Sequence, residues 1–269
     1  MSSAEPEADL QSPSPAMPLI ARSWMRPLAW VTLQALLLLL GLISIGWNLI
    51  AAVLMPLLDE ERGRQVGRRG ISRGYAWFWR VACGSGLLEM DAAALAPLAD
   101  ERGLILVANH PSLLDALLLV AKLPRAACVM KASLLANPFL GSGARLARYI
   151  DNASTHGMVR KAVADLRAGG QLVLFPEGTR TTHPPVNKVH SAVGLISRFS
   201  DAPVQVVFIE TDSPYLGKGW PLWRLPPLPI AFSVRLGPRL SPPADPKGFD
   251  AVLEAHFVAG LQRPPPTSS

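Results

Sequence analysis

Charged residues are scarce in this sequence. They make up 17% of its 269 residues, whereas about a quarter of the residues of an average soluble protein are charged. The deficit has a location, because no charged residue occurs from Leu28 to Pro56. This composition argues against a protein whose whole surface faces water. A chain of this length allows one large domain, or one domain with an anchor.

Cysteine is nearly absent as well. Cys83 and Cys128 are the only two, and they do not form a C-x-x-C pair. This excludes a disulfide-stapled fold and gives no sign of a zinc site or a redox pair. We predict that both are small buried hydrophobic residues. The G-x-S-x-G elbow of serine hydrolases is also missing, so a hydrolase would have to use Ser112 or another serine outside that motif.

The net charge of +6 points to an anionic partner. A basic protein can bind nucleic acid, but no basic face with interleaved aromatic residues and no nucleic-acid-binding motif occurs here. Membrane lipid is the anionic partner that the apolar segment favours, since the arginines that follow this segment would lie well against anionic head groups. We therefore predict a membrane partner and no nucleic acid.

The apolar segment is long enough to enter a membrane. Its core, "VTLQALLLLLGLISIGWNLIAAVLM" (31–55), exceeds the roughly 20 residues that cross the hydrocarbon layer and is too long for a secretory signal peptide. We predict a membrane-anchoring helical region over residues 19–83, with Trp24, Trp30 and Trp47 as interfacial anchors. The segment would either span the membrane or form one arm of a re-entrant hairpin whose second arm is "YAWFWRVACGSGLL" (75–88).

The arginines around this segment predict its orientation. Arg22 and Arg26 precede it, and a larger cluster follows it, namely Arg62, Arg64, Arg68, Arg69 and Arg73. By the positive-inside rule, the C-terminal side lies in the cytosol. We expect a protein of the cytoplasmic (inner) membrane whose catalytic domain faces the cytosol.

The rest of the chain alternates between strand-like and helix-like patterns. Residues 1–18 and 263–269 are predicted to be disordered tails, and residues 84–262 to form the catalytic domain. Strands are expected at 104–108, 127–130, 171–175, 204–209 and 230–236, and helices at 113–123, 157–169 and 191–199. This alternation predicts an α/β fold with a mixed, mostly parallel sheet flanked by helices. In such sheets, ligand sites gather at the carboxyl ends of the strands.

The first motif is "NHPSLLD" (109–115), directly after the strand expected at 104–108. Two residues five positions apart lie about 140° apart on a helix, so His110 and Asp115 cannot pair if both are in the helix body. Pro111 is favoured at the first helical position, which would place His110 at the cap with its ring free to fold back towards Asp115. Such a pair fixes the tautomer of the imidazole and leaves its other nitrogen as a base. A capping histidine beside a solvated aspartate would give the same spacing.

The second motif is "FPEGTR" (175–180), which follows another expected strand. Arg180 supplies a planar fork that suits phosphate, and Gly178 lets the backbone approach a ligand closely. The same residues could also form an ordinary structural turn.

Together, in this order and about 65 residues apart, the two motifs resemble those of the glycerolipid acyltransferase family. Its members include the 1-acylglycerol-3-phosphate acyltransferases of bacterial membranes. The family's N-H-x4-D motif is matched by Asn109, His110 and Asp115, and its F-P-E-G-T-R motif by residues 175–180 at every position. A looser family block is represented by "MKASLLANPFLGSGARLARYIDN" (130–152), with Lys131 near its start. The resemblance covers residues 104 to about 210.

The resemblance implies an acyltransferase domain over residues 84–262. It would move a fatty acyl group from acyl-CoA or acyl-ACP to the hydroxyl of a lysophospholipid acceptor, first of all 1-acyl-sn-glycerol-3-phosphate. His110 would be the general base for the acceptor hydroxyl, and Asp115 would orient its ring. Neither a metal nor a cofactor other than the acyl donor is expected.

The resemblance also assigns substrate-binding residues. The expected set is Glu177, Gly178, Thr179, Arg180, Lys131 and Lys188. Arg180, with Lys131 or Lys188, would hold an acceptor phosphate, and Glu177 would hold an acceptor hydroxyl. The looser block of the family usually ends in an arginine after I-D, whereas this chain has Asn152 there. A different lyso-lipid or another hydroxylated acceptor is therefore the alternative.

Two remoter hypotheses stay open at this point. A metal-dependent phosphoesterase could use His110 and Asp115 with His183 and His190, although the spacing in "THPPVNKVH" (182–190) matches no established ligand pattern. A catalytically silent membrane scaffold could retain the same motifs without turnover.

Overall fold

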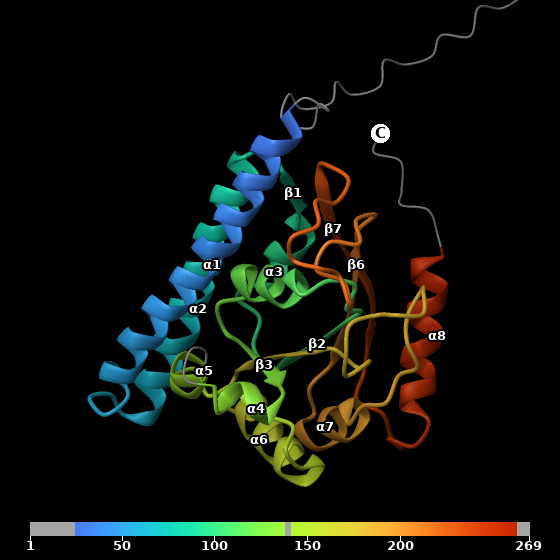
Figure 1. Ribbon diagram of the computed structural model, residues 1–269. Helices are drawn as coiled ribbons and strands as arrows, with labels where there is room; N and C mark the ends of the chain where they lie inside the picture. The colour runs from blue at the N-terminus through green and yellow to red at the C-terminus, as the bar shows by residue number, and fades with distance from the viewer. Residues whose placement is uncertain (1–24, 138–140, 263–269) are drawn as a thin grey trace, which may run out of the picture.

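A computed structural model of the protein describes residues 25–137 and 141–262 (Figure 1). The two predicted tails, 1–18 and 263–269, and the predicted anchor Trp24 lie outside the described residues. Seven strands form one sheet in the order β1-β7-β6-β2-β5-β3-β4. They are β1 (Leu88–Asp91), β2 (Leu104–Ala108), β3 (Ala126–Met130), β4 (Ile150–Asp151), β5 (Gln171–Leu174), β6 (Val204–Glu210) and β7 (Ile230–Leu240).

The sheet confirms the predicted fold class. Every neighbouring pair is parallel except β6 and β7, which are antiparallel. The five predicted strands are all present. The sequence patterns missed β1, whose four residues include two acids, and β4, which has only two residues.

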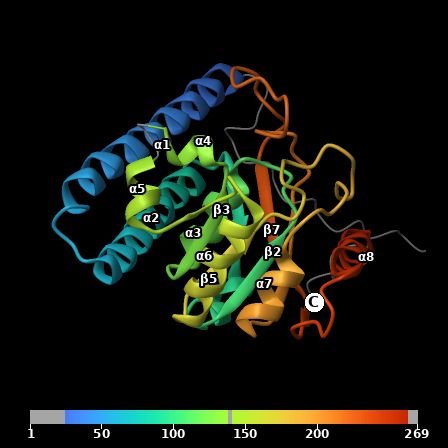
Figure 2. The same cartoon turned by 90° about the horizontal axis from the view of Figure 1, so that it is seen from below.

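Helices cover both faces of the sheet, so its central strands are buried on both sides. In β2, Leu104 and Leu106 face one apolar cluster, and Ile105 and Val107 face the other. Such two-sided burial explains why "LILVA" has no polar alternation. Figure 2 shows α1 and α2 on one side of the molecule and α8 on the other. The helices are α1 (Arg26–Leu54), α2 (Glu60–Gly84), the 3-10 helix η3 (Ala93–Leu98), α3 (Leu114–Lys122), α4 (Ala132–Leu135), α5 (Gly141–Leu146), α6 (Thr155–Arg167), α7 (Val193–Ser200) and α8 (Phe249–Leu261).

The first two helices pack side by side as an antiparallel hairpin (Figures 1 and 2). Among the described residues, α1 is the one helix long and apolar enough to cross a membrane. It turns one face to the protein through residues such as Ala29, Leu33 and Ala51, while the rest of its surface exposes large apolar side chains. Residues 75–84 of the predicted second arm are the last part of α2, and the arm's final residue, Leu88, already belongs to β1. The helix begins at Glu60, where the Asp59 side chain accepts a hydrogen bond from Arg62 N.

Two expectations for this region were wrong. Trp47 is not an interfacial anchor, because its ring lies against the Cα positions of Gly70 on α2 and Gly143 on α5. Arg68 of the arginine cluster does not lie against head groups either, since it is buried. Its guanidinium donates to Asp165 on α6 (2.7 Å) and to the carbonyl oxygens of Ala147 and Arg125. These contacts fasten α2 to the α/β domain.

We expect Gly67→Ala to destabilise the protein. A Cβ at Gly67 would lie 2.4 Å from the nitrogen and 2.6 Å from the Cα of Ala147. These are backbone atoms, which cannot swing aside, so the overpacking should cost about 1–3 kcal/mol. This cost outweighs the roughly 1 kcal/mol that alanine gains over glycine inside a helix.

Gly41→Ala on α1 is the matched control, because its Cβ would meet no atom within 4 Å. It should raise the free energy of unfolding by the helix-propensity gain alone. Denaturant unfolding of both variants in the same detergent measures the difference. Equal effects of the two substitutions would contradict the close approach of α2 to the chain after α5.

Candidate active site

The two motifs meet at one edge of the sheet. Because β2, β3, β5 and β6 are mutually parallel, their carboxyl ends share this edge. His110 lies two residues beyond β2, and Phe175 directly follows β5. Asn109 joins β2 to β6 here, since its side-chain amide donates to Ile209 O and accepts from Ile209 N, each at 2.8 Å. The edge is the place where α/β sheets hold their ligand sites.

His110 and Asp115 form a pair. His110 Nδ1 lies 2.9 Å from Asp115 Oδ2, and the same oxygen accepts a hydrogen bond from Ser112 N at 2.7 Å. The prediction that Pro111 opens the helix was wrong, because α3 begins only at Leu114. The intervening turn brings the ring back to the first helical turn, so the pair forms although α3 begins three residues after Pro111. Among the described residues, His110 Nε2 has no hydrogen-bond partner.

Asp115 is fully buried, and this burial decides its electrostatics. Loss of hydration raises the pKa of Asp115 to about 6, against the lowering effect of its hydrogen bond to His110. Its second oxygen, Oδ1, is buried without a hydrogen-bond partner in the described part of the chain. A carboxylate held in this way is costly to ionise, and a positive charge on the neighbouring imidazole would offset that cost.

Phe175 packs against the face of the imidazole. The two rings stack with centroids 4.1 Å apart at an interplanar angle of 21°. The side chain of His110 is still partly accessible, with 16% of its surface exposed. The motif match alone assigns Phe175 no role, because stacking depends on where two separate loops meet.

Glu177 binds the protein rather than facing an open site. It is buried, and its Oε1 accepts from the backbone nitrogen of His110 and from Thr181 Oγ1, both at 2.8 Å. Its Oε2 accepts from Asn187 N at 2.8 Å. Thr181 N in turn donates to His110 O at 2.7 Å. These contacts differ from the expected one to an acceptor hydroxyl and make Glu177 a brace between the two motif loops.

Arg180 also contacts backbone. Its Nη1 donates to Leu216 O at 2.8 Å and to Gly217 O at 3.0 Å, so it ties the second motif to the loop after β6. Its Nε and Nη2 have no partner among the described residues. Gly178 has a φ of +65°, which favours glycine, and it donates to Phe175 O within the turn. Thr179 is half-buried between them.

The two expected lysines lie in different places. Lys131 directly follows β3 at the same edge of the sheet and is exposed. Lys188 lines a separate groove together with residues of α8. Asn152 follows β4, and its Oδ1 accepts from Ala132 N at the start of α4 (3.3 Å). Lys131 therefore lies at the edge that holds His110, and Lys188 lies between Asn187 and His190, whose backbone nitrogens donate to Glu177 Oε2 and to Pro176 O of the second motif.

The groups that a serine hydrolase or a metal-dependent phosphoesterase would need are not assembled among the described residues. Ser112 is buried, and its hydroxyl donates to Tyr215 O at 3.0 Å. Within the described residues, no three His, Cys, Asp or Glu side chains gather as a metal site would require. His183 and His190, which the phosphoesterase hypothesis needed, are both exposed loop residues.

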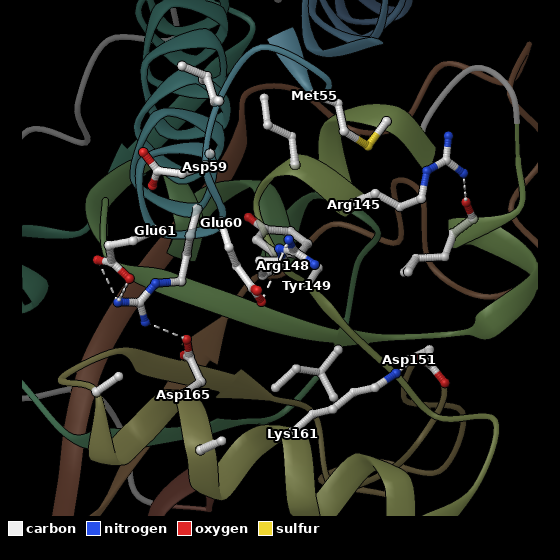
Figure 3. A pocket seen from close by; sticks show the side chains of 18 residues that line it. Met55, Asp59, Glu60, Glu61, Arg145, Arg148, Tyr149, Asp151, Lys161 and Asp165 are labelled. Carbon is white, nitrogen blue, oxygen red and sulfur yellow. Dashed lines mark hydrogen bonds and ion pairs between the residues drawn. The ribbon is translucent and has the colours of Figure 1, made fainter.

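A pocket between the helical hairpin and the α/β domain lies away from His110. It has a volume of about 650 Å³ and is formed by the turn between α1 and α2, by α5 and β4, and by α6 (Figure 3). Acidic and basic side chains line it and bind one another, as Lys161 does with Asp151 and Arg64 does with Asp165. Neither motif contributes a residue to it, so its size does not identify it as the reactive site.

The fold and the site define a class of protein: an α/β protein that holds a His–Asp pair at the carboxyl edge of a mostly parallel sheet. Residues 92–210 match the family model described as Acyltransferase, so this part of the chain is similar to acyltransferases.

A solved structure shares the fold. The crystal structure of the 1-acyl-sn-glycerophosphate (LPA) acyltransferase PlsC from Thermotoga maritima aligns with a TM-score of 0.62. The alignment covers 87% of this chain and 94% of that one, at 20% sequence identity. No curated protein matches the chain.

Proposed function

We propose that this protein is a membrane-bound acyltransferase that moves a fatty acyl group from acyl-CoA or acyl-ACP to the hydroxyl of a lysophospholipid. The first candidate acceptor is 1-acyl-sn-glycerol-3-phosphate, which would give phosphatidic acid. The observation that carries the proposal is the His110–Asp115 pair, which leaves Nε2 of His110 unoccupied at the carboxyl edge of an acyltransferase domain. The similar fold of PlsC, an LPA acyltransferase, supports this choice of acceptor.

The chemistry follows from the pair. His110 Nε2 takes the proton from the acceptor hydroxyl as its oxygen attacks the thioester carbonyl. The new C–O bond forms, the C–S bond breaks, and the imidazolium returns the proton to the departing thiolate. Asp115 holds the ring through Nδ1 and stabilises the imidazolium while it exists. This direct transfer requires neither a metal nor a covalent acyl-enzyme.

The acceptor phosphate would bind beside this pair. Arg180 has N–H donors on Nε and Nη2 that remain available for a charge-assisted bond. Lys131 is the second cation at this edge of the sheet. Glu177 acts in the proposal as a positioning residue, because its carboxylate already binds both motif loops. Gly178 and Thr179 complete the loop that carries Arg180.

Attachment to the cytoplasmic membrane would use the helical hairpin within residues 19–83. Both ends of α1 touch the α/β domain, through Trp30 Nε1 to Trp223 O and through Gly143 N to Asn48 Oδ1. A helix held along its length favours the hairpin over a span that stands apart from residues 84–262. On α2, exposed Arg69, Arg73 and Arg80 would meet anionic head groups on the cytosolic side.

An acceptor panel tests the proposal. Purified enzyme with radiolabelled acyl-CoA or acyl-ACP should acylate lysophosphatidic acid in preference to zwitterionic and uncharged lyso-lipids. The alternative, a drift to another acceptor, depends on Asn152, which gives hydrogen bonds but no charge. Charge-assisted bonds are about twice as strong as neutral ones. If the acceptor has drifted, Asn152→Arg should raise the preference for lysophosphatidic acid several-fold. No acyl transfer to any lyso-lipid would contradict the proposed function.

A further inference from the structure

The segment between β6 and β7, residues 211–229, has an apolar tip that faces outward. Leu222 is 52% exposed and Trp223 is 74% exposed. Trp220, three residues earlier, is instead packed against the core, with the Arg224 guanidinium 4.9 Å above its ring. The segment therefore packs Trp220 against the protein and leaves Trp223 exposed. Single exposed apolar residues are ordinary, whereas a cluster that extends another apolar surface marks an interaction site.

The tip is fastened to α1. Trp30 Nε1 donates to Trp223 O at 2.7 Å, and Gln34 Nε2 donates to Leu222 O at 3.0 Å. Figures 1 and 2 both show this segment beside the N-terminal end of α1. Trp30 itself is partly exposed, as is the rest of the outer face of α1. The tip therefore extends the apolar face of the proposed membrane anchor.

The base of the same segment is fastened to the candidate active site. Ser112 Oγ donates to Tyr215 O at 3.0 Å, and Leu113 N donates to Leu216 O at 3.1 Å. Arg180 Nη1 binds Leu216 O and Gly217 O. One short stretch of chain thus contacts both motifs at its base and α1 at its tip.

We propose that residues 211–229 form a second membrane-contacting element, whose tip enters the interfacial region of the leaflet that holds α1. The inference rests on the membrane attachment proposed above. Tryptophan favours the head-group boundary. The exposed cations Lys218 and Arg224 flank the tip, where they would bind lipid phosphates. The segment sets the height of the His110 site above the leaflet, so that a lyso-lipid enters the site by lateral diffusion.

Depth-dependent quenching tests the contact directly. An environment-sensitive thiol probe is placed in turn at Leu222→Cys, at Leu38→Cys on the outer face of α1, and at Phe199→Cys on α7. The background carries Cys83→Ser and retains Cys128, because burial raises the pKa of that thiol to about 12 and keeps it unreactive. Phe199 is 57% exposed, and α7 lies remote from α1 in both views.

Vesicles of phosphatidylglycerol and brominated phosphatidylcholine should quench the probes at Leu222 and Leu38 and leave the one at Phe199 unchanged. Quenching at Leu38 without quenching at Leu222 would overturn the inference while the anchor stands. Quenching at neither position would contradict the membrane attachment itself, and the inference with it.

An activity comparison separates a membrane role from a role in the site. The double variant Leu222→Ser/Trp223→Ser should weaken vesicle partitioning about ten-fold, as the loss of interfacial contact by two large apolar side chains implies. It should slow acylation of a long-chain acceptor embedded in vesicles and leave the rate on a short-chain acceptor in free solution unchanged. Phe199→Ser is the control and should change neither rate. An equal loss on both acceptors, or a dimer that dissociates on substitution, would refute the membrane contact.

Discussion

Replacing His110 by alanine should abolish acyl transfer while leaving the protein folded and bound to membranes. The pair with Asp115 leaves Nε2 as the one base that the two motifs offer to an acceptor hydroxyl. General-base catalysis of this kind contributes about 10²- to 10⁴-fold, so kcat/KM should fall by at least that factor. Steady-state rates with an acyl thioester and a lyso-lipid acceptor measure the loss.

His183→Ala is the matched control. This histidine is exposed, and its ring contacts the neighbouring Thr182 hydroxyl (3.0 Å) rather than either motif. Its loss should leave the rate within about two-fold, because surface substitutions away from special features change little. Unfolding curves and vesicle binding of both variants should match those of the unaltered protein. Near-normal turnover by a folded His110→Ala protein would refute the mechanism.

The sequence predicted the fold well where burial leaves a simple pattern. Strands such as β2 and β6 are apolar on both faces, and Pro and Gly residues mark their ends. It identified only the last part of α2 as a separate helical arm, because glycine and arginine occupy the face of the earlier turns that packs most closely. Gly67 admits the backbone near Ala147, and Arg68 pairs with Asp165 far along the chain. Such residues weaken the apolar periodicity that identifies a helix.

The site was predictable as a pair of motifs and not as a set of contacts. The H-x4-D spacing indicated the His–Asp pair, and the structure brings the two side chains together. The contacts of Glu177 and Arg180 depend on loops that lie 10 and 36 residues away in the chain. No local sequence pattern predicts contacts with such distant loops.

Asp115→Asn should lower kcat/KM about 10- to 100-fold, a smaller loss than that of His110→Ala. Both His110 Nδ1 and Ser112 N bind the same oxygen, Oδ2, whereas Oδ1 has no partner among the described residues. An asparagine oxygen at the Oδ2 position keeps both contacts and the imidazole tautomer. What disappears is the negative charge that stabilises the imidazolium, and a hydrogen bond to a charged group contributes about 1.5–3 kcal/mol. The same kinetic assay, with His110→Ala beside it, measures the order of the two losses.

The same substitution should relieve a cost to stability that depends on pH. Burial raises the pKa of Asp115 from 3.8 to about 6. Between these values the folded protein holds a proton that the unfolded chain releases, so this group lowers stability as pH rises from about 4 to 6. Above pH 6 the loss levels off at about 2–3 kcal/mol. Asparagine has no charge to bury, although its amide group would occupy the position of Oδ1 without a partner.

Denaturant unfolding in detergent between pH 4 and pH 7.5 therefore distinguishes the two proteins. The free energy of unfolding of Asp115→Asn, measured relative to the unaltered protein, should rise through pH 4–6 and then stay constant. Asp212→Asn, at an exposed position, should show no such rise. A flat difference across this range would mean that Asp115 is not a buried carboxylate of raised pKa. A loss of activity equal to that of His110→Ala would mean that the amide has turned its NH₂ group to the imidazole. A buried carboxylate that costs stability at neutral pH and speeds the reaction is what selection for catalysis, rather than for stability, retains at such a site.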